Sequence, residues 1–228
     1  MNAGKVYLIP TVLHEDATAF AVLPAYLLEA IKECSALFVE NLKTARRFLK
    51  RIDPAIQIDD FQWFTIHKAE DAVKAAFLQE LRQGKTIGIL SEAGCPGIAD
   101  PGQQLVEAAQ ALGCTVKPFV GPSSLLLALM ASGMNGQHFR FRGYLPIEVT
   151  ERKKSLKLLE TEALRTNCTQ LFIETPYRNQ SLLKDILQTC QDSTRLCIAV
   201  DITSAEESIK KTELFAEHGH LISTENKS

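Results

Sequence analysis

The segment Ser91-Glu-Ala-Gly-Cys-Pro-Gly-Ile-Ala-Asp-Pro-Gly102 joins the apolar run Thr86–Leu90 to a helix that we expect over Gly102–Leu112. Its glycines let the main chain come close to a ligand, and its prolines fix φ, so less entropy is lost on binding. Asp100 can cap the following helix, and Pro101 suits its first turn. The segment therefore predicts a preset ligand-binding turn. A long, well-capped surface loop remains the alternative.

A second strand-to-helix turn, Gly121-Pro-Ser-Ser124, follows the apolar stretch Thr115–Val120. Ser123 or Ser124 can cap the next helix, whose free N–H groups suit a polar or anionic ligand group. In an open parallel sheet, ligands bind at the carboxyl ends of the strands. We therefore expect the two turns, on consecutive strand ends, to converge on one cleft. A plain helix cap is the alternative for the second turn.

The first part of the chain alternates apolar stretches typical of buried strands with stretches of helical periodicity. Single helices between strands indicate βαβ units and a mainly parallel sheet, so the predicted fold class is α/β. Besides the two strands above, the expected strands are Val6–Pro10, Ala36–Val39 and Phe61–Ile66, and the expected helices are Ala21–Cys34, Thr44–Ile52, Glu70–Gln83, Gly102–Leu112 and Ser123–Ser132.

The stretch Ser132-Gly-Met-Asn-Gly136 is the best candidate for a linker, because it is rich in glycine and polar residues. A boundary near residue 135 predicts two α/β domains, residues 1–135 and 136–228. In the second domain we expect strands at His138–Tyr144, Gln170–Glu174 and Arg195–Ile202, helices at Glu151–Arg165 and Ser181–Cys190, a helix or a hairpin strand at Glu206–Thr212, and disorder at Ser223–Ser228.

The composition argues against several classes of protein. The 228 residues include 25 basic and 27 acidic side chains, so binding of nucleic acid requires a local patch rather than bulk charge. We find no apolar run near the ~18–20 residues that span a bilayer, and the start of the chain reads as a strand rather than a secretory signal. Six dispersed cysteines predict reduced thiols in a cytoplasmic protein, and five dispersed histidines predict no metal site.

Five segments carry a resemblance that covers nearly the whole chain. They resemble, in order and spacing, the tetrapyrrole-methylase-type (class III) S-adenosylmethionine-dependent methyltransferases. Within these, the branch that methylates a ribose 2′-hydroxyl of small-subunit ribosomal RNA is the most similar. The segments are SEAGCPGIADPG (91–102), GPSSLLLALMASG (121–133), FRFRGYLP (139–146), ERKKSL (151–156) and LFIETPYR (171–178).

The resemblance implies two α/β domains, usually in a homodimer, with the methyl donor S-adenosylmethionine in the cleft between the domains. It also implies a set of donor-binding residues from both domains. These are Gly94, Cys95, Pro96, Ile98, Ala99, Ser123 and Ser124 from the two turns, and Glu174, Thr175, Pro176 and Ala199 from the second domain.

Two segments depart from the pattern of the ribose methylases. Val12-Leu13-His14-Glu15-Asp16 replaces a Gly-Asn-Leu element after the first strand. Glu40-Asn-Leu-Lys-Thr44 replaces an acidic-threonine-arginine-histidine stretch after the second. Both segments are expected to face the methyl acceptor. The sequence therefore follows the family pattern more closely in the donor-binding segments than in the acceptor-facing ones.

A hydroxyl acceptor is a poor nucleophile, so methyl transfer to it benefits from a nearby base. The candidate carboxylates are Glu40, Glu92 and Asp100, with Glu174 as a fourth, and each also has a structural interpretation as a cap, a loop charge or a pocket wall. Cys95 lies in the glycine-rich turn, but no nearby histidine supplies a base for a thiol nucleophile.

Basic side chains are candidates for contact with an RNA backbone. They are Arg46 and Arg47 on the first basic helix, Arg140 and Arg142 on one face of a strand, and Lys153 and Lys154 on a second helix. Such runs are also typical of solvated faces. Two further hypotheses stay open: a methyltransferase for a small molecule such as a tetrapyrrole-like compound, and a non-catalytic donor-binding relative.

Overall fold

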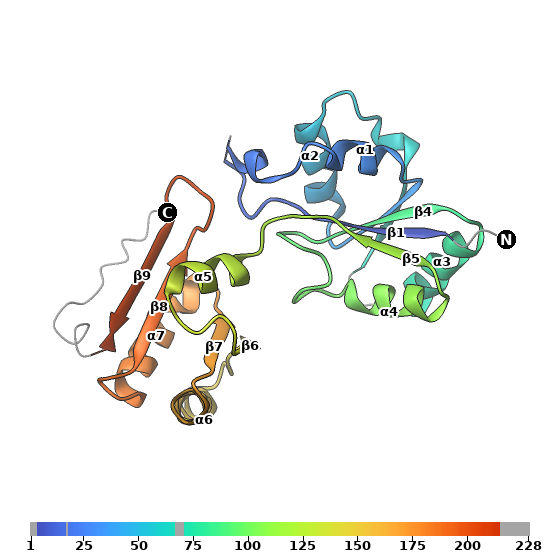
Figure 1. Cartoon of the computed structure of the whole chain (residues 1–228). Coiled ribbons are helices and arrows are strands. Elements are labelled where there is room, and N and C mark those ends of the chain that lie inside the picture. The colour runs from blue at the N-terminus through green and yellow to red at the C-terminus, as the bar shows by residue number, and fades with distance from the viewer. Residues whose placement is uncertain (1–3, 17, 67–70, 215–228) are drawn as a thin grey trace. The chain divides into compact units, whose positions relative to one another are not determined.

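The computed structural model describes residues 4–16, 18–66 and 71–214 (Figure 1). The chain divides into two compact units. Unit 1 is Met1–Ser124 with Thr203–Ala205, and unit 2 is Leu125–Ile202 with Glu206–Ser228. The expected boundary near residue 135 falls inside unit 2, and the expected disorder at Ser223–Ser228 lies outside the described residues.

Unit 1 is built on a parallel five-stranded sheet, which confirms the predicted fold class. The strand order is β3-β2-β4-β1-β5, so β1 lies between β4 and β5, with Ile9 opposite Leu90 on one side and Lys5 opposite Thr115 on the other. The strands are β1 (Lys5–Ile9), β2 (Ala36–Val39), β3 (Gln62–Thr65), β4 (Thr86–Leu90) and β5 (Thr115–Pro118).

Helices cover both faces of this sheet (Figure 1). Alternate strand residues point to opposite faces, so Ile9 and Leu37 join a core beneath α1 and α2, while Val6 and Phe38 join a core beneath α3 and α4. The helical segments are η1 (Ala19–Val22), α1 (Leu27–Lys32), α2 (Leu42–Ile52), η2 (Ile58–Asp60), α3 (Asp71–Arg82) and α4 (Gln103–Ala111).

Two expected helices differ from the structure for local reasons. The expectation of one helix over Ala21–Cys34 is wrong, because Leu23 precedes Pro24 and takes an extended backbone with ψ 138°, which separates η1 from α1. Helix α2 begins earlier than expected because the Asn41 side chain accepts hydrogen bonds from the N–H groups of Lys43 (2.9 Å) and Thr44 (3.3 Å).

Unit 2 contains a parallel pair, β6 and β7, and an antiparallel hairpin, β8 and β9. The ambiguous segment Glu206–Thr212 is therefore largely strand, because β9 pairs with β8. Leu156, Leu182 and Ile186 form part of the core. The elements are α5 (Ser124–Ser132), β6 (Phe139–Tyr144), α6 (Val149–Thr166), β7 (Thr169–Ile173), η3 (Pro176–Arg178), α7 (Asn179–Thr189), β8 (Arg195–Val200) and β9 (Ser208–Glu213).

Within residues 4–16, 18–66 and 71–214, none of the helices combines the length and apolarity that crossing a bilayer requires. The same part of the chain brings together no group of three histidine, cysteine, aspartate or glutamate side chains that could hold a metal ion.

An ion pair joins α6 to α7 inside unit 2. Arg152 is 3% exposed, and its Nε donates to the Asp185 carboxylate at 2.8 Å while another guanidinium nitrogen reaches Ser181 Oγ at 2.9 Å. Lys153 approaches the same carboxylate only at 3.6 Å. Arg152 is thus a structural residue rather than part of a basic surface.

Replacing Arg152 by Met leaves the Asp185 carboxylate buried with only the distant Lys153. We expect the free energy of unfolding to fall by about 3–5 kcal/mol, and the paired change Arg152→Met with Asp185→Leu to recover most of the loss. Urea denaturation of the full chain measures both. Lys154→Met, on the same helix, serves as the control with a change within about 0.5 kcal/mol. An equally small effect of Arg152→Met would contradict this account.

Candidate functional site

Three strand-end turns of unit 1 meet at Gly94. The carbonyl oxygen of Gly94 accepts hydrogen bonds from the Thr11 N–H at 2.9 Å and from Ser91 Oγ at 3.1 Å. A Cβ at Gly94 would lie 3.0 Å from the Pro122 carbonyl oxygen. The two glycine-containing turns are therefore in contact, and their shared cleft stays a prediction. The sequence did not reveal that the residues after β1 lie against both turns, Thr11 against the first and Pro10 against the second, because strand order cannot be read from periodicity.

The second turn, Gly121–Ser124, packs closely against Pro10, which follows β1. A Cβ at Gly121 would lie 2.1 Å from the Pro10 side chain, so only glycine fits.

The Cys95 thiol donates to the Pro122 carbonyl oxygen at 3.4 Å. Burial raises the pKa of Cys95, which keeps the thiol protonated and agrees with the view that it is not a nucleophile.

Asp100 fixes the shape of the glycine-rich turn. Its carboxylate accepts hydrogen bonds from the N–H groups of Gly97 (2.9 Å) and Gly102 (2.7 Å), whereas helix α4 begins only at Gln103. The expectation that Asp100 caps this helix is therefore wrong. Burial raises the pKa of Asp100, and the two N–H bonds partly offset this rise. The bonds hold a turn in which Ala99 has φ +59°, a conformation that costs energy for a residue with a Cβ.

One side of the turn is open. A Cβ at Gly97 would meet no atom within 4 Å. The neighbouring Ile98 is 55% exposed, and Val120, next to the second turn, is 71% exposed. Exposed backbone beside apolar side chains suits a flat, partly polar group such as an adenosyl moiety.

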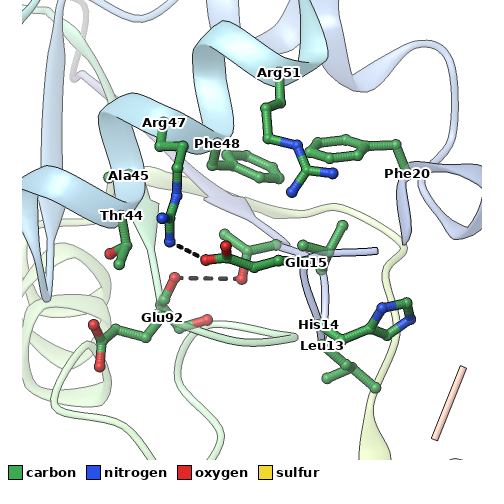
Figure 2. A pocket seen from close by; sticks show the side chains of 13 residues that line it. Leu13, His14, Glu15, Phe20, Thr44, Ala45, Arg47, Phe48, Arg51 and Glu92 are labelled. Atoms are coloured by element: carbon green, nitrogen blue, oxygen red, sulfur yellow. Dashed lines mark hydrogen bonds and ion pairs between the residues drawn. The ribbon is translucent and has the colours of Figure 1, made fainter. Parts of the chain in front are cut away.

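Val12, Leu13, His14 and Glu15 of the first segment that departs from the ribose-methylase pattern line a pocket of about 170 Å³, and Thr44 of the second segment lines it too (Figure 2). The chain thus brings the turn after β1 and the start of α2 together, whereas the role of the two segments at an acceptor site stays a prediction. Ser91 and Glu92 close the pocket from the β4 turn. The other lining residues are Thr11, Phe20, Ala45, Arg47, Phe48 and Arg51.

Charged groups surround this pocket. Arg47 forms an ion pair with Glu15. Arg51 donates to the Asp16 carbonyl oxygen at 3.0 Å and lies 4.8 Å from the centre of the Phe20 ring. The His14 Nδ1 accepts the Asp16 N–H at 3.3 Å, whereas its Nε2 is buried without a hydrogen-bond partner among the described residues.

The three candidate bases have different environments. The Glu40 carboxylate accepts the Glu92 N–H at 3.0 Å, and burial raises its pKa. Glu40 therefore positions the turn after β4, much as Asp100 positions the glycine-rich turn. Of the three, only Glu92 lines the pocket, and its side chain is exposed.

The candidate donor-binding residues of unit 2 lie mainly after β7. One Glu174 oxygen accepts the Thr175 N–H at 2.8 Å, and the other lies 3.0 Å from Arg178. Pro176 begins η3 directly after them. Ala199 lies apart in the chain, on β8 opposite Ile209.

The candidate RNA-binding cations of unit 2 have partners within their own unit. Arg140 and Arg142 both pair with Glu162 on α6. Lys153 donates to the Gln188 side chain at 2.8 Å, and Lys154 donates to Glu151 at 2.7 Å. On α2, Arg46 stacks over the Trp63 ring at 5.3 Å, and the Arg47–Glu15 pair is exposed.

Curated proteins similar in sequence share one name, although no family model matches the chain. The ribosomal RNA small subunit methyltransferase I of Buchnera aphidicola is 31% identical, over 91% of this chain and 69% of its own length. The protein of the same name from Halalkalibacterium halodurans is also 31% identical, over 82% of this chain and 60% of its own. The chain thus spans about three fifths to two thirds of the length of these relatives.

Solved structures support the fold. The methyltransferase CobJ superposes with a TM-score of 0.60 at 17% identity, covering 94% of this chain and 87% of its own. Uroporphyrin-III C-methyl transferase from Thermus thermophilus, complexed with S-adenyl homocysteine, gives 0.57 at 15% identity, covering 96% and 92%. By its fold and its 31% identity across more than two thirds of the Buchnera protein, the chain belongs to the ribosomal RNA small subunit methyltransferase I family.

Proposed function

We propose that the protein is an S-adenosylmethionine-dependent methyltransferase that methylates a ribose 2′-hydroxyl of small-subunit ribosomal RNA. Membership of the family supports the reaction. The observation that carries the proposal is the junction of three turns at Gly94, next to a pocket that Ser91 and Glu92 also line. The turn after β4 would thereby contribute to both the proposed donor site and the proposed acceptor pocket.

The turns in unit 1 fit the donor because their backbone is open at Gly97 and flanked by exposed Ile98 and Val120. We assign the donor to both units, in a homodimer as the resemblance implies. The residues that would hold it are Gly94, Cys95, Pro96, Ile98, Ala99, Ser123 and Ser124 of unit 1 and Glu174, Thr175, Pro176 and Ala199 beyond it.

When bound, the donor supplies a methyl group on a sulfonium, which a nucleophile takes by in-line displacement without a metal. The chain has to hold the acceptor oxygen about 3–3.5 Å from the reacting carbon and exclude water. A base that removes the hydroxyl proton contributes about 10²–10⁴-fold. Glu92 is our candidate, because Glu40 and Asp100 already bind backbone N–H groups.

The α2 side of unit 1 is the part of the protein that we expect to contact RNA. Arg46 and Arg47 lie there, whereas Arg140 and Arg142 share the Glu162 carboxylate as their ion-pair partner. The pocket volume also favours RNA over a tetrapyrrole-like acceptor. About 170 Å³ is well below the roughly 300–1,000 Å³ of pockets that bury drug-sized ligands, so it suits a group smaller than a macrocycle.

Gly94→Ala should abolish measurable donor binding or weaken it more than about tenfold in calorimetry with S-adenosylmethionine. Its Cβ meets the Pro122 carbonyl oxygen, and its φ of +73° strains any residue with a side chain. Gly113→Ala is the matched control, because Gly113 has φ +68° but open space around it. Equal donor affinity in the two variants would remove the turn from the donor site.

Small ribosomal subunits from cells that lack this protein should accept a radioactive methyl group from the donor. Alkaline cleavage of RNA needs a free 2′-oxygen, so a methylated ribose leaves the label in an alkali-resistant dinucleotide. Label in mononucleotides would indicate base methylation instead. Label confined to a small-molecule extract would support the tetrapyrrole-like alternative, and donor binding without any transfer would support the non-catalytic one.

A further inference from the structure

Glu15 forms an ion pair with Arg47, whose side chain lines the proposed acceptor pocket. Arg47 and Arg51 lie one turn apart on α2 and both line the pocket, where Arg47 reaches the Glu15 carboxylate and Arg51 lies beside the Phe20 ring (Figure 2). Arg47 pairs with this carboxylate, and Arg51 donates to the Asp16 carbonyl oxygen. Two guanidinium groups thus border a pocket whose wall combines apolar side chains, such as Val12 and Phe20, with polar ones.

The Arg47–Glu15 pair is easily exchanged. The Arg47 side chain is 47% exposed and that of Glu15 is 61% exposed, and an ion pair with such exposure is worth only about 0–1 kcal/mol. A guanidinium binds a phosphate through two parallel hydrogen bonds at least as well as it binds a carboxylate. A phosphate that is also anchored through the rest of its nucleotide can therefore displace Glu15.

The apolar wall suits one nucleobase. The rings of Phe20 and Phe48 stack with centres 5.7 Å apart and 23° between their planes, and both line the pocket beside Val12. Unstacked bases of RNA pack on aromatic and apolar side chains. A pocket of about 170 Å³ has room for a single heterocycle, whereas a base pair is too large for it.

We propose that this pocket takes one unpaired nucleotide of the RNA, with its base against the half-buried Phe20 and Val12 and its phosphate on Arg47 in place of Glu15. The assignment rests on the proposed methyltransferase function and names the part of the substrate that unit 1 recognises. Glu15 acts as an internal competitor that neutralises Arg47 in the absence of RNA.

The test is a double-mutant cycle on the binding of a single-stranded oligoribonucleotide of about ten nucleotides, measured by fluorescence anisotropy without the donor. Glu15→Gln should tighten binding about two- to fivefold, because it removes the competitor. Arg47→Ala should weaken binding about tenfold and lower the slope of log affinity against log salt. In the Arg47→Ala background, Glu15→Gln should change nothing.

Lys50→Ala is the control on the same helix, because Lys50 donates to the Pro54 carbonyl oxygen away from the pocket. It should leave the effect of Glu15→Gln intact. A duplex of the same sequence should bind more weakly and show no gain from Glu15→Gln. If Arg47→Ala lowers the melting temperature, Arg47→Lys keeps the charge without the paired hydrogen bonds and should give an intermediate loss.

Two results separate the failure of this inference from the failure of the proposed function. Normal calorimetric binding of S-adenosylmethionine, together with an unchanged or weakened oligonucleotide affinity of Glu15→Gln, overturns the nucleotide assignment alone. The same holds if Glu15→Gln tightens binding equally in the Arg47→Ala background. Absence of donor binding by the unmodified protein overturns the proposed function itself.

Discussion

The close approach of three backbone turns at the carboxyl end of the unit 1 sheet is the constraint on which the rest depends. Gly94 and Gly121 permit this approach, because a Cβ on either would meet Pro122 or Pro10. The strand order makes the approach possible, since β1 lies between the strands that carry the two turns.

Two carboxylates hold that shape. Asp100 binds the N–H groups on both sides of the strained Ala99, and Glu40 binds the N–H of Glu92. Glu40 and Asp100, which the sequence suggests as candidate catalytic bases, therefore hold backbone segments in place. This is a common outcome for buried acids in loops, because a backbone N–H that is left without a partner there costs about 1–3 kcal/mol.

Patterns that depend on local chemistry are readable from the sequence. The alternation of strands and helices follows from periodicity, and the two turns follow from their glycines and prolines. The split at Pro24 is also local, but a proline at that place is equally compatible with the first turn of one longer helix. The two divergent segments fall in regions that the resemblance places at the acceptor; that role stays a prediction, although the first segment and Thr44 of the second line one pocket.

Features that depend on contacts between distant residues are not readable in this way. Arg140 and Arg142 pair with a single carboxylate, Glu162, from another element, and Arg152 is buried against Asp185. A run of cations in a sequence carries no information about acids that lie 20 or more positions away. Strand order is equally hidden, which is why periodicity gives no sign that Pro10 and Thr11 contact the two turns.

The bond between Glu40 and Glu92 has a mechanical consequence. It ties the end of β2 to the segment that leaves β4, and that segment is itself tied to Thr11 through Gly94. A movement of the start of α2 that shifts Glu40 therefore also shifts the backbone at Glu92, which leads into the glycine-rich turn. Under the function proposed above, a substrate that shifts the start of α2 therefore also pulls on the backbone beside the donor turn.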